Sequence, residues 1–146
     1  MFVIDEKSPY EVAIFIDMSG SSYVQMHVIK AFVKMYHDKL PTIQSLLGDN
    51  YCLHFVTFSN VTMEIIKITP DNIGDLNNFK YHCGGAADLQ CCWKYMLDNQ
   101  IGVSIVFTDG LLPWGTDPGM EINFIIHSDI KLHSYPPYGN TQRYDP

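Results

Sequence analysis

The sequence has 146 residues, of which 47% are hydrophobic and 17% are charged, and its net charge is -7. This length predicts a single domain over residues 1–146, and a domain of this size buries roughly 70% of the surface of its unfolded chain. The negative charge argues against a nucleic-acid surface, because Lys and Arg would have to neutralise phosphates and the nine basic residues are scattered.

The start of the chain reads neither as an export signal nor as a membrane anchor. Residues 1–9 have no basic start and no long apolar run. No window reaches the 18 or more apolar residues of a membrane-spanning helix. The four cysteines, at positions 52, 83, 91 and 92, match no common zinc spacing. We therefore expect a cytoplasmic protein with reduced thiols and no membrane partner. A phage or bacterial source is a separate expectation that no residue of the chain establishes.

The first forty residues predict a strand, a short loop and a long helix. Residues 10–16 form a near-continuous apolar run, which is typical of a strand buried on both faces. Residues 22–40 carry apolar side chains at helical spacing over about five turns. Pro41 fits just beyond the end of this helix.

The middle of the chain predicts two strands and two helical segments. Residues 51–58 form a second strand, and residues 62–68 form a third. The turn signal between them, Ser-Asn at 59–60, makes the third strand an antiparallel partner at a sheet edge. Residues 71–78 predict a short helical turn, and residues 86–98 predict a helix.

The last third predicts two more buried strands, at 103–107 and 122–127. Only about a dozen residues, rich in Pro and Gly, separate them, so no full crossover helix is expected there. Residues 130–135 predict a last short strand before a Pro- and Tyr-rich tail. The alternation of apolar strands with helices predicts one Rossmann-like α/β domain in three layers, with a mainly parallel sheet and an antiparallel edge strand.

Two acidic loops follow predicted strands, and ligands of open α/β sheets bind at such strand ends. Residues 17–21 read Asp-Met-Ser-Gly-Ser, so Asp17, Ser19 and Ser21 offer three oxygens at alternate positions. Asp109, in the loop at 108–110, adds a second carboxylate. Two carboxylates about 5 Å apart repel by roughly 3 kcal/mol at an effective dielectric constant of 20. A bound cation would remove this repulsion. Because the ligands are hard oxygens, the expected cation is Mg²⁺, Mn²⁺ or Ca²⁺.

These loops resemble the metal-ion-dependent adhesion site of von Willebrand factor A domains. Residues 16–21 resemble its first motif, residues 84–88 its Gly-Gly-Thr-Asp loop, and residues 106–110 the strand and loop that supply its second aspartate. Residues 136–139, Pro-Pro-Tyr-Gly, resemble the Pro-Phe-Gly end of a subfamily found at the C-terminus of predicted metallopeptidase-like proteins. That subfamily often occurs near MoxR-type AAA ATPases.

The resemblance implies a metal-dependent protein-binding module and no enzyme. Ser19 and Ser21 would ligate the cation directly, and Asp17 and Asp109 directly or through water. An Asp or Glu of a protein partner, with a MoxR-type AAA ATPase as one candidate, would complete the coordination.

One residue departs from the family pattern. Ala87 stands where the family carries a ligand threonine, so the site lacks one neutral oxygen, and water is one replacement. Asp88 and Thr108 are expected to support the ligands or to substitute for the lost oxygen, although Asp88 could instead cap the following helix. Trp114, in the Pro/Gly-rich loop, is expected to be either a local lid or a partner contact.

Other functions stay open at this point. A metal-free structural or assembly protein would use the same fold with a decayed site. A Mg²⁺-dependent phosphoryl-transfer enzyme, as in haloacid-dehalogenase-type folds, would need an Asp at the position of Ser19.

The motifs also have plainer interpretations. The first loop could be only a strand-to-helix turn with Ser21 or Ser22 as the N-cap, and the two glycines at 84–85 could cradle a phosphate. His54 and His127 fit core or surface positions better than zinc ligands. The tail tyrosines at 135, 138 and 144 would cover the sheet edge or meet a partner.

Overall fold

Six strands form one sheet in the order β3-β2-β1-β4-β5-β6. The structure, a computed structural model, describes residues 9–19, 26–81, 84–127 and 135–144. Among the strands of these described residues, only the β2–β3 pair is antiparallel, and every other neighbouring pair is parallel. The predicted mainly parallel sheet with an antiparallel edge strand is therefore confirmed. The strands are β1 (Tyr10–Asp17), β2 (Tyr51–Phe58), β3 (Thr62–Ile68), β4 (Val103–Thr108), β5 (Glu121–Ile126) and β6 (Asn140–Arg143).

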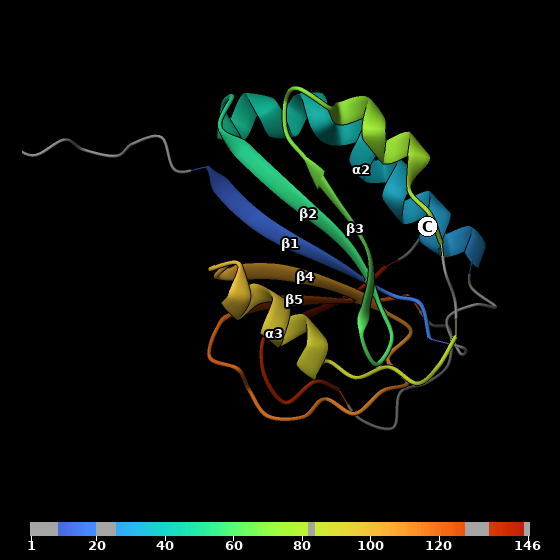
Figure 1. Ribbon diagram of the computed structural model, residues 1–146. Helices are drawn as coiled ribbons and strands as arrows, with labels where there is room; N and C mark the ends of the chain where they lie inside the picture. Colours follow the sequence, from blue (N-terminus) through green and yellow to red (C-terminus); the bar gives the residue numbers. More distant parts are fainter. Residues whose placement is uncertain (1–8, 20–25, 82–83, 128–134, 145–146) are drawn as a thin grey trace, which may run out of the picture.

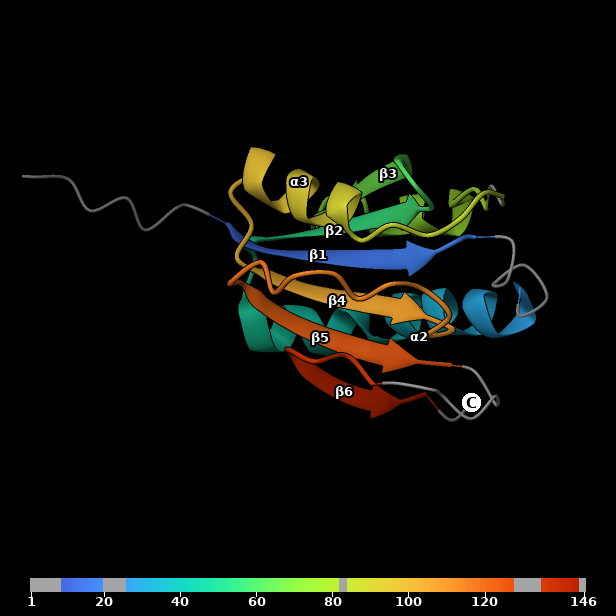
Figure 2. The same ribbon diagram turned by 90° about the horizontal axis from the view of Figure 1, so that it is seen from below.

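Helices and loops cover both faces of this sheet. Helix α2 (Met26–Leu47) lies on one face, and helix α3 (Gln90–Asp98) lies on the other (Figures 1 and 2). Alternate residues of β1 enter the two apolar clusters: Ala13 and Phe15 pack on the α3 side, and Ile14 and Ile16 on the α2 side. This double burial explains why the strands read as continuous apolar runs. Within the described residues, no helix is both long enough and apolar enough to cross a membrane.

Helix α2 does not end before Pro41, as the sequence predicted, but continues through it to Leu47. A proline inside a helix removes one backbone hydrogen bond and crowds the preceding turn. Here the apolar stripe continues beyond it, since Leu40 is buried and Ile43 and Leu47 pack against the same cluster. The burial of this last stretch therefore outweighs the local cost of the proline.

Helix α3 begins at Gln90, four residues later than the predicted start at 86. The residues before it are held in a loop by backbone hydrogen bonds to the ends of β1 and β2. The Gly84 amide donates to the Met18 carbonyl at 3.0 Å, and the Asp88 amide donates to the Ser59 carbonyl at 2.8 Å. These bonds fix residues 84–88 beside the residues that follow β1 and β2, and the helix begins only after this loop. The short helical turn predicted at 71–78 is present as η1 (Ile73–Asn78).

The connection between β4 and β5 contains no helix, as predicted. Its loop runs over the face that α3 also covers (Figure 2). Trp114 is buried in this loop, and Leu112 and Met120 pack against the same apolar cluster. Three apolar side chains thus cover the sheet where a crossover helix would otherwise lie.

The final strand, β6, was not predicted from the sequence. The predicted strand at 130–135 falls mainly on residues outside the described ranges, and Tyr135 is in no strand. The strand found is Asn140–Arg143, which pairs with β5 and has four exposed residues. Gly139 leads into it with φ +73°, and a Cβ there would lie 2.7 Å from the Ile122 carbonyl oxygen. This close approach accounts for the glycine of the Pro-Pro-Tyr-Gly segment.

Candidate metal site

The two aspartates predicted from the sequence lie at the ends of neighbouring strands. Asp17 is the last residue of β1, and Asp109 follows the last residue of β4. β1 and β4 are parallel neighbours, and the strand order changes direction between them. Ligands of open α/β sheets bind at this topological switch point. Both side chains are buried, with 0% exposure for Asp17 and 2% for Asp109.

Two hydrogen bonds fix the carboxylate of Asp17. The Ser19 amide donates to Oδ1 at 2.9 Å, and the Thr108 hydroxyl donates to Oδ2 at 2.7 Å. The Gly110 amide donates in turn to the Thr108 hydroxyl oxygen at 3.1 Å. Thr108 therefore orients Asp17 across the β1–β4 pair, and its support of a metal ligand stays a prediction.

Asp109 has one carboxylate oxygen without a partner. Its Oδ1 accepts the Leu111 amide at 3.0 Å, whereas its Oδ2 is buried and has no hydrogen bond. Within the described residues, no ion pair joins Asp17 or Asp109 to a Lys or Arg. A buried carboxylate oxygen that lacks a partner is energetically costly. These oxygens fit a divalent cation, which would supply the missing partner.

Burial raises the pKa of Asp17. The hydrogen bonds from Thr108 and Ser19 oppose this shift of the pKa, and the nearby charge of Asp109 adds to it. The charged form of this carboxylate is therefore held in an environment that disfavours it. A cation between the two aspartates would reverse that preference.

The other residues of the predicted loops differ in their placement. Ser19 is buried beside Asp17, whereas Ser21 lies outside the described residues. Ala87 packs in the apolar cluster on the α3 side, so this position gives the site no oxygen. Asp88 is exposed, and its Oδ1 accepts the Gln90 amide at 2.9 Å. This contact holds the start of α3, which matches the capping alternative for Asp88.

Trp114 is 8% exposed, and its ring packs on Phe124 with centroids 5.3 Å apart. Its carbonyl accepts a hydrogen bond from the Tyr138 hydroxyl. Trp114 therefore packs locally over the sheet, as the local-lid alternative expects, and its role as a partner contact stays a prediction. Of the tail tyrosines, Tyr138 is buried, Tyr144 packs on Phe107, and Tyr135 is exposed.

His127 is a neighbour of the site that the sequence analysis did not connect with it. It follows β5, its amide donates to the Thr108 carbonyl at 3.0 Å, and its ring stacks on Phe107. Both ring nitrogens are buried without a hydrogen-bond partner. Burial lowers the pKa of His127 to about 4, and the charge of Asp109 opposes this shift. Its place at the end of the strand predicted over 122–127, on the edge of the sheet where Asp17 lies, was the available signal.

The lowered pKa of His127 predicts a loss of stability in acid. Because the folded protein holds this proton less tightly than the unfolded chain, stability is full above pH 6.5 and falls as the pH decreases toward 4. We expect about 3 kcal/mol of the unfolding free energy to be lost between pH 7 and 4 through this residue. Over the same pH range, the unfolding free energy of the His127→Phe variant, measured by denaturant unfolding, should fall by about 3 kcal/mol less than that of the wild type. A control at an exposed histidine, His27→Gln, should behave as the wild type; equal pH dependence in all three proteins would contradict the assignment.

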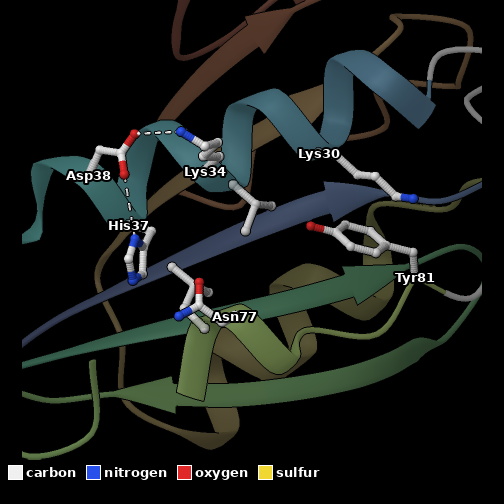
Figure 3. Close-up of a pocket in the computed structure, with 8 residues that line it drawn as sticks. Lys30, Lys34, His37, Asp38, Asn77 and Tyr81 are labelled. Carbon is white, nitrogen blue, oxygen red and sulfur yellow. Dashed lines mark hydrogen bonds and ion pairs between the residues drawn. The ribbon is translucent and has the colours of Figure 1, made fainter. Parts of the chain in front are cut away.

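One cavity lies away from the aspartates. It has a volume of about 410 Å³ and lies between α2 and the segment after β3 (Figure 3). Its charged groups are largely engaged with one another: Asp38 contacts Lys34 at 3.2 Å and His37 at 3.5 Å. Lys30 lies 5.7 Å from the centre of the Tyr81 ring. No buried carboxylate faces this cavity, so it does not compete with the strand ends as a cation site.

Comparisons with known proteins support the fold. No protein-family model matches the sequence, and the search of curated proteins found no match. One similar solved structure is a von Willebrand factor type A protein from Catenulispora acidiphila, with a TM-score of 0.51, 16% identity, and coverage of 83% of this chain and 34% of that chain. Another is an aerotolerance-related membrane protein from Bacteroides fragilis NCTC 9343, carrying multiple mutations to serines, with a TM-score of 0.54, 18% identity, and coverage of 80% and 66%.

This chain therefore has a von Willebrand factor A-like fold. It spans about a third of the length of the first protein and 66% of the second. At these identities the likeness concerns the fold alone, and activity has to be argued from the site.

Proposed function

We propose that this protein is a metal-dependent protein-binding module. Asp17, Ser19, Ser21 and Asp109 would hold Mg²⁺, or alternatively Mn²⁺ or Ca²⁺. An Asp or Glu of a partner protein would complete the coordination. The observation that carries the proposal is the buried, unpartnered Oδ2 of Asp109 next to a second buried carboxylate at the switch point of the sheet.

The chemistry of the donors supports a hard cation. Carboxylate and hydroxyl oxygens suit Mg²⁺ or Ca²⁺, whereas soft metals prefer sulfur and nitrogen. Ala87 supplies no oxygen, so water would take that position. Mg²⁺ commonly keeps several waters in protein sites, and such a site has room for a carboxylate from outside.

The same residues favour binding over catalysis. Phosphoryl transfer on a comparable scaffold would need an acid/base carboxylate where this chain has Ser19. A serine hydroxyl does not exchange protons readily near neutral pH, and the amide of Ser19 is bound to Asp17. A metal-free assembly module remains the competing function, because Ala87 removes one ligand of the family pattern.

The proposal also includes a partner, a cellular location and a source. The likeness of residues 136–139 to the end of the metallopeptidase-like subfamily suggests a MoxR-type AAA ATPase as partner. We also propose a cytoplasmic location and a phage or bacterial source. A pull-down with such an ATPase, with and without Mg²⁺, addresses the partner directly.

Calorimetric titration of Mg²⁺ and Mn²⁺ into the metal-stripped protein tests the site. We expect saturable binding that is lost in Asp17→Ala and kept in Asp88→Asn, which removes an exposed charge from the neighbouring loop while retaining a capping oxygen. Absence of binding to the wild type would favour the metal-free module. Hydrolysis of a generic phosphate ester would instead favour the enzyme.

A further inference from the structure

A second group of metal-binding side chains lies at the opposite end of β1 and β2. Glu11 of β1 is directly opposite Cys52 of β2 in the register, and His54 follows Cys52 by two residues on the same face. Their donor atoms all lie within 4.8 Å of one another. We propose that Glu11, Cys52 and His54 bind a zinc ion.

His54 is held as a metal-binding imidazole is usually held. Its Nδ1 lies 2.7 Å from the Tyr95 hydroxyl on α3, and its Nε2 lies 2.9 Å from Glu11 Oε1. Histidine ligands commonly fix the nitrogen that does not bind metal through a hydrogen bond to a neighbouring group. When Nδ1 donates its proton to Tyr95, the lone pair of Nε2 faces the Glu11 carboxylate. Two electron-rich atoms in contact need a cation or a proton between them.

The donor set favours zinc over the hard cations. One thiolate, one imidazole and one carboxylate suit four-coordinate Zn²⁺, and three protein ligands leave a position for water. Zinc–ligand bonds of about 2.0–2.3 Å require the donor atoms to approach more closely than they do here. The approach would come from Glu11, whose side chain is 32% exposed, because His54 is 2% exposed and contacts Tyr95. The same exposed side offers the ion a route in.

This site is independent of the aspartates. Glu11 and Asp17 are six residues apart on β1, which is about 20 Å along an extended strand. The donors come from two strands, so no Cys or His spacing in the sequence could have indicated them. The failure of either site would leave the other untouched.

Cobalt titration of the reduced, metal-stripped protein tests the proposal, because a Co²⁺–thiolate bond gives a distinctive near-ultraviolet absorption. We expect this band to appear in the wild type, to bleach when Zn²⁺ is added, and to persist in Asp17→Ala. It should vanish in Cys52→Ala, which removes a buried thiol, and persist in Cys91→Ala, which removes a partly buried thiol outside the proposed site. Tyr95→Phe should weaken Zn²⁺ binding about tenfold, since it leaves the ligands in place but releases the imidazole.

A second variant protects the test against misfolding of Cys52→Ala. Glu11→Gln keeps the size of a partly exposed side chain and removes its charge, so it should fold and bind Zn²⁺ at least tenfold more weakly. A band that survives in Cys52→Ala, or is lost in Cys91→Ala, would overturn the assignment. So would the absence of any thiolate band in the wild type, which would leave Glu11, His54 and Tyr95 as a hydrogen-bonded network only.

Discussion

Replacing Trp114 by alanine is expected to lower the free energy of unfolding by about 3–5 kcal/mol. The indole is buried and packs edge-to-face on Phe124, within the apolar cluster that also receives Tyr138. Parallel neighbours such as β4 and β5 are usually joined through a helix that covers the sheet. Because the β4–β5 loop contains no helix, its few apolar side chains cover this part of the sheet. Removal of the largest of them, the Trp114 indole, leaves a cavity.

Denaturant unfolding of Trp114→Ala beside Leu111→Ala measures this effect. Leu111 lies in the same loop but is 45% exposed, so its loss should change stability by no more than about 0.5 kcal/mol. Trp114→Phe should recover much of the stability because an aromatic ring still meets Phe124. If Trp114→Ala and Leu111→Ala were equally mild, the loop would not be part of the core, and the prediction that Trp114 contacts a partner would gain support.

The sequence predicted the fold best in the strands that are buried on both faces. Strands β1, β2 and β4 are buried on both faces, so each appears as an apolar run that ends within a residue of the observed strand. The positions of Asp17 and Asp109 followed from those strand ends, because parallel strands bring their carboxyl ends to one edge of the sheet. Local pattern and tertiary placement agree in this part of the chain.

The errors occur where tertiary contacts override local signals. Pro41 is a helix-ending signal, yet the apolar residues on both sides of it keep α2 continuous. β6 carries the polar sequence Asn-Thr-Gln-Arg, which has no alternation because all four residues are exposed at the sheet edge. The Glu11–His54 contact depends on the register of two strands 43 residues apart, which no spacing rule encodes.

Replacing Asp109 by asparagine is expected to make the metal-free protein more stable than the wild type and the protein in excess metal less stable than the wild type. In the metal-free protein, Asp109→Asn removes a buried charge that repels Asp17, so the unfolding free energy should rise by about 1 kcal/mol. The raised pKa of Asp17 determines the pH range of this effect. The folded protein binds the Asp17 proton more tightly than the unfolded chain does, so the metal-free wild type loses stability as the pH rises above 3.8. The advantage of the variant should therefore be present at neutral pH and shrink in acid.

Added metal should invert the order of the two proteins. A cation at a hundred times its dissociation constant stabilises the folded wild type by about 2.7 kcal/mol, whereas the variant lacks one ligand charge and should gain little. Denaturant unfolding in EDTA and in excess Mg²⁺ measures both states, and Asp88→Asn controls for a change of net charge at an exposed carboxylate. A variant stabilised by Mg²⁺ as strongly as the wild type would remove Asp109 from the ligand set. Higher stability without metal and lower stability with it would indicate that the two buried carboxylates are kept for a cation and not for the fold.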